Sequence, residues 1–177
     1  HAGGLVYGDI SPQNIYISKD AKYAEVWFID ADNLRFETSK TGSRVFTPSY
    51  GAPELVQNKD CGRPRSDCYA FSIMAFYMLS MIHPFIGKAT EEDDADWASD
   101  GDSNEDQAYA GQLPWVDDPV DTSNSNQSGW PRGLILTKEL NDLFHGTFED
   151  GRLNYWKRPS IYHWAEAFAR AADSTLM

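Results

Sequence analysis

The segment 8–14, Gly-Asp-Ile-Ser-Pro-Gln-Asn, contains two residues that could carry chemistry together. Asp9 and Asn14 stand on a Pro-containing loop, and the β-branched and aromatic residues 15–17 that follow predict a strand. Such an aspartate can accept or orient a hydroxyl proton, while the asparagine offers a neutral oxygen to a hard cation. An isolated pair at this spacing is more often a solvated turn, so the interpretation depends on other parts of the chain.

A second pair of carboxylates, Asp30 and Asp32, follows the apolar strand predicted over residues 24–29. Carboxylates at the end of a strand can bind Mg²⁺ together with the phosphates of a substrate. In the alternative interpretation, the aspartates accept hydrogen bonds from backbone N–H groups in a turn. For an isolated D-x-D pair this alternative is the commoner one.

Three later motifs favour the chemical interpretation. Residues 47–54 read T-P-S-Y-G-A-P-E, Asp67 stands at the start of a long apolar stretch, and residues 157–160 read K-R-P-S. Together with the two earlier segments, and in this order, they resemble the protein-kinase family over residues 1 to about 172, apart from an acidic segment. The resemblance implies a mainly α (α+β) fold, with a helical core and a small β-hairpin near the catalytic loop.

The resemblance also implies ATP and Mg²⁺ as cofactors, and the Ser/Thr hydroxyl of a protein substrate as the acceptor. Asp9 matches the catalytic aspartate that orients this hydroxyl. Asn14 and Asp30 match the ligands that hold Mg²⁺ against the nucleotide phosphates, with Asp32 as a further carboxylate beside them. Thr47 falls where Ser/Thr kinases keep a threonine beside the catalytic aspartate.

Three further matches imply structural roles. Glu54 and Arg158 match a buried ion pair that ties the activation segment to the later helices. Asp67 matches a buried aspartate whose carboxylate braces the backbone of the catalytic loop. The resemblance therefore implies that residues far apart in the sequence meet around this loop.

Several residues depart from the family pattern. Tyr7 and Gly8 replace the His-Arg pair before the catalytic aspartate, which implies that control by activation-loop phosphorylation is lost. Ser11 replaces a lysine that contacts the transferred phosphate, and Asp32 replaces the glycine of D-F-G. Both changes make the site more negative, which implies altered metal use or weak activity.

The chain contains no glycine-rich loop, no lysine in a V-A-I-K context and no partner glutamate on a helix. We therefore expect residues 1–177 to form a C-terminal lobe that is inactive alone and needs an N-terminal lobe as its partner. Two alternatives stay open. One is a small-molecule kinase of the aminoglycoside-phosphotransferase or RIO type, and the other is a pseudokinase that serves as a binding or scaffolding module.

The elements that must position these residues are mostly helices. Catalytic and metal-binding loops with short strands occupy residues 1–35, and the activation segment occupies 36–54. A helix capped by Ser66 or Asp67 is expected to run to about Ile82 and, being apolar on all sides, to be buried all round. An acidic insert follows over 88–131, where Trp97, Trp115 and Trp130 suggest that parts of it pack on the domain. Residues 132–177 are expected to contain the C-terminal helices.

Composition limits the remaining functions. The net charge is −12, and twelve acidic residues with no Lys or Arg lie between Glu91 and Asp121. This pattern gives no basic surface for nucleic acid, and no apolar run is long enough for a membrane span. Two cysteines, Cys61 and Cys68, are too few for a disulfide scaffold and favour a reduced, cytoplasmic protein. The sequence predicts no oligomeric state.

Overall fold

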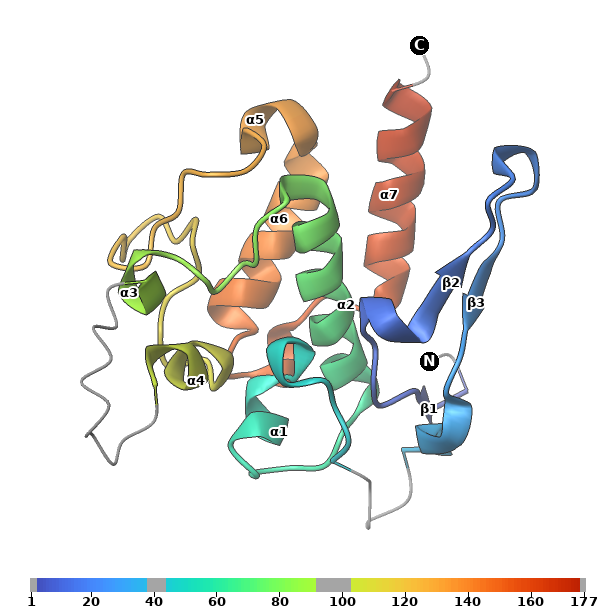
Figure 1. The fold of residues 1–177 in the computed structure, drawn as a ribbon, viewed down its shortest axis with the longest axis horizontal. Coiled ribbons are helices and arrows are strands. Elements are labelled where there is room, and N and C mark those ends of the chain that lie inside the picture. Colours follow the sequence, from blue (N-terminus) through green and yellow to red (C-terminus); the bar gives the residue numbers. More distant parts are fainter. Residues whose placement is uncertain (1–2, 38–43, 92–102, 176–177) are drawn as a thin grey trace.

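A computed structural model describes residues 3–37, 44–91 and 103–175 (Figure 1). Helices are its predominant regular elements, and two small antiparallel sheets lie at one side, in agreement with the predicted mainly α class. Among the described residues, no helix is both long enough and apolar enough to cross a membrane.

The two sheets frame the segment 8–14. Strand β1 (Leu5–Val6) pairs with β4 (Arg35–Phe36), and β2 (Ile15–Ile17) pairs with β3 (Val26–Phe28). The sequence predicted the β2–β3 hairpin but not the β1–β4 pair, because two-residue strands leave no periodic pattern to detect. The chain between β1 and β2 is the segment that contains Asp9 and Asn14, so both sheets fix its ends.

Helix α2 (Pro64–Ser80) lies at the centre of the molecule. It begins before the predicted Ser66 or Asp67 cap, because Pro64 occupies its first turn and the Ser66 hydroxyl accepts the N–H of Arg63 at 3.1 Å. It ends before the predicted Ile82, where Met81 takes a left-handed conformation with φ of 62°. The prediction of burial on all sides was also wrong at its C-terminal end, where Met78 is 57% exposed.

The other helices surround α2. Helix α1 (Pro53–Val56) precedes it, while α5 (Arg132–Ile135), α6 (Lys138–His145) and α7 (Ile161–Thr175) follow. Aromatic side chains meet around Phe76 of α2, whose ring centroid lies 5.2 Å from that of Phe144 on α6 and 5.8 Å from that of Trp115, between α4 and α5. Such edge-to-face pairs add to the energy of burial. This aromatic core holds the site's supporting helix in place.

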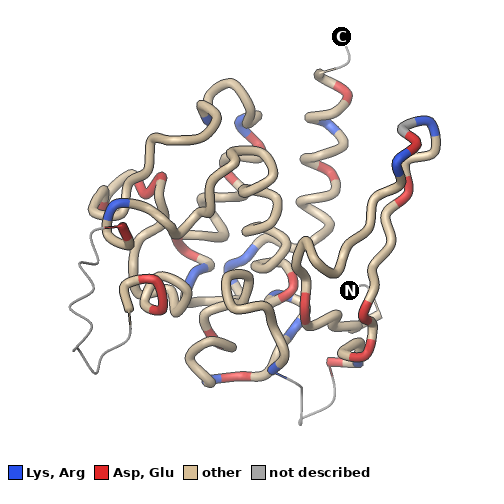
Figure 2. Tube along the Cα trace, viewed as in Figure 1, with Lys and Arg blue, Asp and Glu red and all other residues tan. Residues whose placement is uncertain are grey.

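The acidic segment 88–131 contributes to this core. Its described part contains α3 (Lys88–Glu91) and α4 (Asn104–Tyr109), which are linked by a 2.8 Å hydrogen bond from Asn104 Nδ2 to the Ala89 carbonyl. Trp115 is buried as expected, but Trp130 is 60% exposed, and Trp97 lies outside the described residues. Figure 2 shows acidic residues on α4. The part of the segment after residue 103 is thus packed structure and not only a charged excursion.

Candidate active site

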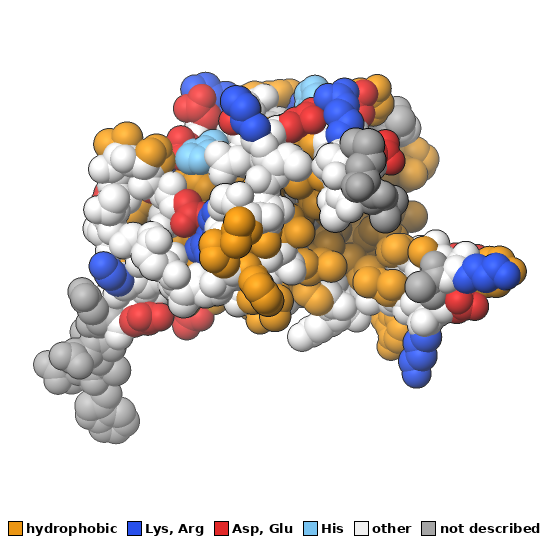
Figure 3. All heavy atoms as spheres, turned by 90° about the horizontal axis from the view of Figure 1, so that it is seen from above, with side chains coloured by type: hydrophobic (Ala, Val, Ile, Leu, Met, Phe, Trp, Pro, Cys, Tyr) orange, Lys and Arg blue, Asp and Glu red, His pale blue; other side chains and the backbone are white. Residues whose placement is uncertain are grey.

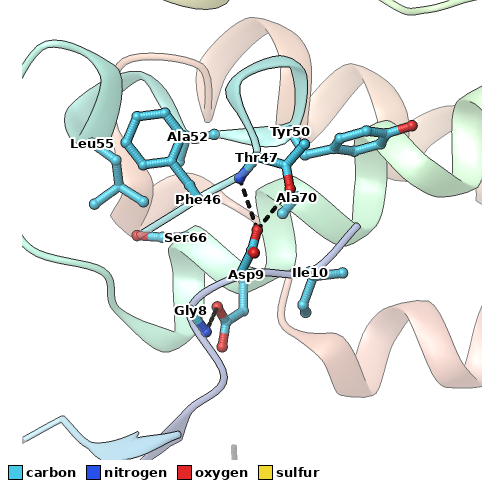
Figure 4. A pocket seen from close by; sticks show the side chains of 12 residues that line it. Gly8, Asp9, Ile10, Phe46, Thr47, Tyr50, Ala52, Leu55, Ser66 and Ala70 are labelled. Carbon is cyan, nitrogen blue, oxygen red and sulfur yellow. Dashed lines mark hydrogen bonds between the residues drawn. The ribbon is translucent and has the colours of Figure 1, made fainter. Parts of the chain in front are cut away.

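Asp9 lies in the middle of a hydrogen-bond network that joins the segment 8–14 to Thr47 (Figure 4). Its Oδ1 accepts both the backbone N–H of Thr47, at 2.7 Å, and the Thr47 hydroxyl, at 2.9 Å. The Asn14 amide Nδ2 donates to Asp9 Oδ2 at 3.0 Å and to the Asp9 carbonyl at 2.9 Å. Three predicted site residues are therefore in direct contact, and both oxygens of the Asp9 carboxylate are held in place.

Asp67 supports the backbone just before Asp9. Its side chain is buried, and its two oxygens accept the N–H groups of Tyr7, at 2.7 Å, and Gly8, at 3.0 Å. Gly8 has a φ of +95°, a conformation that L side chains rarely adopt. The glycine that departs from the family pattern is therefore explained by the local backbone, which Asp67 fixes from α2.

The β2–β3 hairpin brings Asp30 towards the same loop. Asn14 ends a short 3₁₀ turn (Pro12–Asn14), and its carbonyl accepts the Ile29 N–H at 3.0 Å. Asp30 follows directly, with an exposed side chain and a left-handed backbone of φ 58°. Asp32 is also exposed, in the 3₁₀ turn after it. Backbone pairing thus sets where the Asp30 carboxylate is presented relative to Asn14.

Tyr7 is a second link between these segments, and the sequence identified it only as a departure from the family. Its hydroxyl donates to the Ile29 carbonyl, and its ring packs edge-on against Phe28 with centroids 5.2 Å apart. Burial raises the pKa of the Tyr7 hydroxyl, and the nearby carboxylates of Asp30, Asp9 and Asp67 raise it further. Tyr7 therefore stays protonated as a donor that connects the start of the 8–14 loop to Ile29, the residue before Asp30.

The donor set around Asn14 and Asp30 fits a magnesium ion that carries phosphate. Because Asn14 Nδ2 is committed to Asp9, its Oδ1 faces away as an acceptor, and the Asp30 carboxylate is exposed. Within the described ranges no group of three or more His, Cys, Asp or Glu residues could hold a metal ion. Mg²⁺ in phosphate-transfer sites usually takes one or two carboxylates, waters and the substrate phosphates, so a sparse protein donor set is appropriate.

Ser11, which stands where the family has a lysine, does not reach the surface of the site. It is fully buried, and its hydroxyl has no hydrogen-bond partner within the described part of the chain. A polar group buried without a partner destabilises the fold. Because the residue is a serine and is buried, this position supplies no cation to the site.

Glu54 and Arg158 form a buried, two-pronged ion pair. Arg158 Nη1 donates to Glu54 Oε1 at 2.8 Å and Nη2 to Oε2 at 2.7 Å, and the Arg158 side chain is 0% exposed. Burial opposes ionisation of Glu54, but the hydrogen bonds and charge of Arg158, with the Ser66 hydroxyl, outweigh it and lower the pKa of Glu54. The pair fixes α1, and with it the end of the segment that carries Thr47, to the region before α7.

Comparison with known families matches residues 1–161 to the protein kinase domain. Among curated relatives, a RAC family serine/threonine-protein kinase homolog of Dictyostelium discoideum is 29% identical over 52% of this chain and 21% of its own length. The human cAMP-dependent protein kinase catalytic subunit PRKX is 36% identical over 48% of the chain and 23% of its own length. Serine/threonine-protein kinase PknL of Mycobacterium tuberculosis is 36% identical over 49% and 22%.

These alignments span about a fifth to a quarter of each relative's length. The family match, by contrast, covers most of this chain and includes all the residues of the Asp9 network and the Glu54–Arg158 pair. The chain belongs to the protein kinase domain family.

Proposed function

We propose that this chain is the catalytic C-terminal lobe of a serine/threonine protein kinase that transfers the γ-phosphate of ATP to a protein hydroxyl. The observation that carries the proposal is the pair of hydrogen bonds from Thr47 to Asp9 Oδ1, combined with the bond from Asn14 to Asp9 Oδ2. A carboxylate fixed at both oxygens can orient a hydroxyl without first having to reorganise.

In this proposal Asp9 accepts a hydrogen bond from the substrate hydroxyl and aims its oxygen at the phosphoryl group. The Thr47 segment and Asn14 keep the carboxylate from rotating away, and Asp67 prevents movement of the backbone that carries it. Asn14 and Asp30 would hold Mg²⁺, which neutralises phosphate charge when bound with ATP. The protein's own contribution is mainly alignment, because phosphoryl transfer depends chiefly on how the reacting groups are positioned.

We further propose that an N-terminal lobe covers the β2–β3 hairpin. The hairpin has apolar side chains on both faces: Tyr16 and Trp27 are 59% and 49% exposed on one face, while Ile17 and Phe28 face a groove on the other. A two-stranded hairpin with two apolar faces is marginal in water unless other elements cover it.

The groove beside the hairpin has a volume of about 530 Å³ and is lined by apolar residues of the hairpin, α2 and α7 (Figure 3). Exposed apolar surfaces of this extent mark contact sites for other protein segments. Because the alignments cover only 21–23% of three relatives, those kinases have much additional chain that could supply such a cover. We therefore expect weak Mg-ATP binding by residues 1–177 alone.

The second candidate function is a binding or scaffolding module without catalysis. The burial of Ser11 favours it, because the position where the family has a lysine next to the transferred phosphate holds a buried, uncharged side chain. The retained Asp9, Asn14 and Asp30 favour the enzyme.

The test uses the complete polypeptide with γ-labelled ATP and Mg²⁺, offered separately to Ser/Thr peptides and to aminoglycosides. We expect label on peptides only, and its loss in Asp30→Asn while Asp20→Asn, at the hairpin tip, behaves as wild type. Label on aminoglycosides would support the small-molecule alternative. Absence of transfer to either acceptor, with the protein folded, would favour the scaffold.

A further inference from the structure

His83 connects the acidic segment to the turn that carries Thr47. It lies after α2, and its Nε2 is 2.9 Å from the carbonyl of Ser49, in the 3₁₀ turn Pro48–Tyr50. The Phe85 N–H donates to His83 Nδ1 at 3.2 Å. Because Nδ1 accepts a hydrogen bond, the proton of the neutral ring is on Nε2, and His83 is the donor to Ser49.

Aromatic rings hold the imidazole in this orientation. Tyr109 of α4 lies 5.5 Å from it, centroid to centroid, Tyr50 of the turn lies at 6.5 Å and Phe85 at 6.3 Å. Burial lowers the pKa of His83 to about 4, and the Ser49 carbonyl and the Glu105 carboxylate of α4 only partly oppose this. The ring is therefore neutral at pH 7, as the donor geometry requires.

The same turn is held by Asp9 from its other side. Thr47 precedes the turn, its carbonyl accepts the Tyr50 N–H at 2.8 Å, and its own N–H and hydroxyl bind Asp9. Tyr50 also lines the small cavity beside Asp9 (Figure 4). Movement of the turn at Ser49 would therefore also move Thr47, which donates to the Asp9 carboxylate.

We propose that His83 is a positioning residue: supported by Tyr109 of α4, it fixes the 47–50 turn and thereby the donors that orient Asp9. The catalytic consequence rests on the function proposed above, whereas the mechanical coupling does not. The proposal gives the acidic segment a role in arranging the site, through the helix α4 that contacts the turn.

Two substitutions separate the donor role of His83 from its bulk. His83→Gln places an amide N–H near the position of Nε2 and can keep the bond to Ser49. His83→Asn is shorter and keeps an acceptor near Nδ1 for the Phe85 N–H, but it cannot reach Ser49. His163→Asn, at the exposed start of α7, is the matched control.

The measurement is amide hydrogen exchange of Thr47 and Tyr50 in the 177-residue chain, together with ¹⁵N shifts of the His83 ring. We expect His83→Asn to speed exchange at both amides by about fivefold, the factor for one lost hydrogen bond. His83→Gln and His163→Asn should match wild type, and the Asn141 amide of α6 should be unchanged in every variant. The wild-type ring should show a protonated Nε2 and an unprotonated Nδ1.

Equal exchange in the Asn and Gln variants, or a proton on Nδ1, would overturn the proposal. Faster exchange at Asn141 as well would show general loosening of the fold and would also count against it. Hydrogen exchange can be measured without phosphoryl transfer. If the protein proves catalytically inactive, the peptide-labelling test of the proposed function fails, but the exchange measurement still decides the role of His83.

Discussion

Removal of either partner of the Glu54–Arg158 pair should destabilise the domain strongly. The Arg158 side chain is 0% exposed and the Glu54 side chain 11%, so neither charge can turn to water when its partner is lost. Arg158 also donates from Nε to the Gly151 carbonyl at 2.7 Å and from Nη2 to the Arg152 carbonyl at 3.1 Å. Its guanidinium lies 4.7 Å from the ring of Tyr69.

These contacts set the expected magnitudes. Glu54→Ala leaves a buried guanidinium with carbonyl partners but no counter-charge, and should lower the free energy of unfolding by about 3–5 kcal/mol. Arg158→Ala should have a similar effect, because it leaves the Glu54 carboxylate with the Ser66 hydroxyl but no counter-charge, and removes the donor to the carbonyls of Gly151 and Arg152. The double variant should be much more stable than the sum of the two losses predicts, since it strands no charge. Arg158→Lys should lie between, because an ammonium cannot reproduce the two-pronged geometry.

Urea unfolding followed by tryptophan fluorescence measures these effects, because Trp115 and Trp164 are both buried. The control is Arg170→Ala on α7, whose pair with Glu139 is 63% and 41% exposed and should contribute at most about 1 kcal/mol. Additive losses of about 0.5 kcal/mol or less for Glu54→Ala and Arg158→Ala would refute the reasoning. They would mean that the pair does not anchor the segment that carries Thr47.

Three further changes test other parts of the structure. The pKa of His83 is about 4 in the folded protein and 6.5 in the unfolded chain, so between these pH values the unfolded chain binds a proton that the folded protein does not. The free energy of unfolding should therefore fall as the pH is lowered from 6.5 to 4, by up to about 3 kcal/mol. Urea unfolding of His83→Gln should lack this part of the pH dependence, and an unchanged profile would contradict the assignment. Asn124→Ala removes the donor to the buried carbonyls of Phe85 and Pro114 and should lower the free energy of unfolding by about 2 kcal/mol. Gln127→Ala, at an exposed position, should cause almost no change, and equal effects of the two substitutions on urea unfolding would contradict the role of Asn124. Tyr7→Phe removes the donor to the Ile29 carbonyl and should cost about 1 kcal/mol in the same assay while speeding exchange of the Ile29 amide; unchanged exchange would contradict its linking role.

The residues that the sequence identified best were those tied to short motifs. Asp9 and Asn14 lie in one segment and Thr47 in another, and their likeness to a family pattern was visible before any contact was known. The structure brings all three within hydrogen-bond distance. The C-terminal helices expected within residues 132–177 were also predictable, because apolar spacing and capping residues are local signals.

Contacts that depend on the path of the chain could not be predicted in this way. No sequence motif pointed to His83, because its partner Ser49 is remote in sequence and contributes only a carbonyl. Asn124 looked like part of a polar excursion, although it is fully buried between two carbonyls. Burial of a polar residue is decided by tertiary partners, which composition does not reveal. The exposed C-terminal end of α2 was missed for a similar reason, since the apolar composition of a helix does not predict which neighbouring elements cover it.

The most direct test of the central claim is the rate of phosphoryl transfer to a Ser/Thr peptide by the complete polypeptide carrying Asp9→Asn, at saturating Mg-ATP and peptide. The substitution keeps an oxygen for the two Thr47 donors but removes the charged acceptor for the substrate hydroxyl. We predict that the rate falls by at least about 100-fold, the usual effect of losing such a group, with an unfolding midpoint close to that of wild type. A folded Asp9→Asn protein that transfers phosphate within about tenfold of the wild-type rate would contradict the assignment of Asp9 as the residue that orients the acceptor.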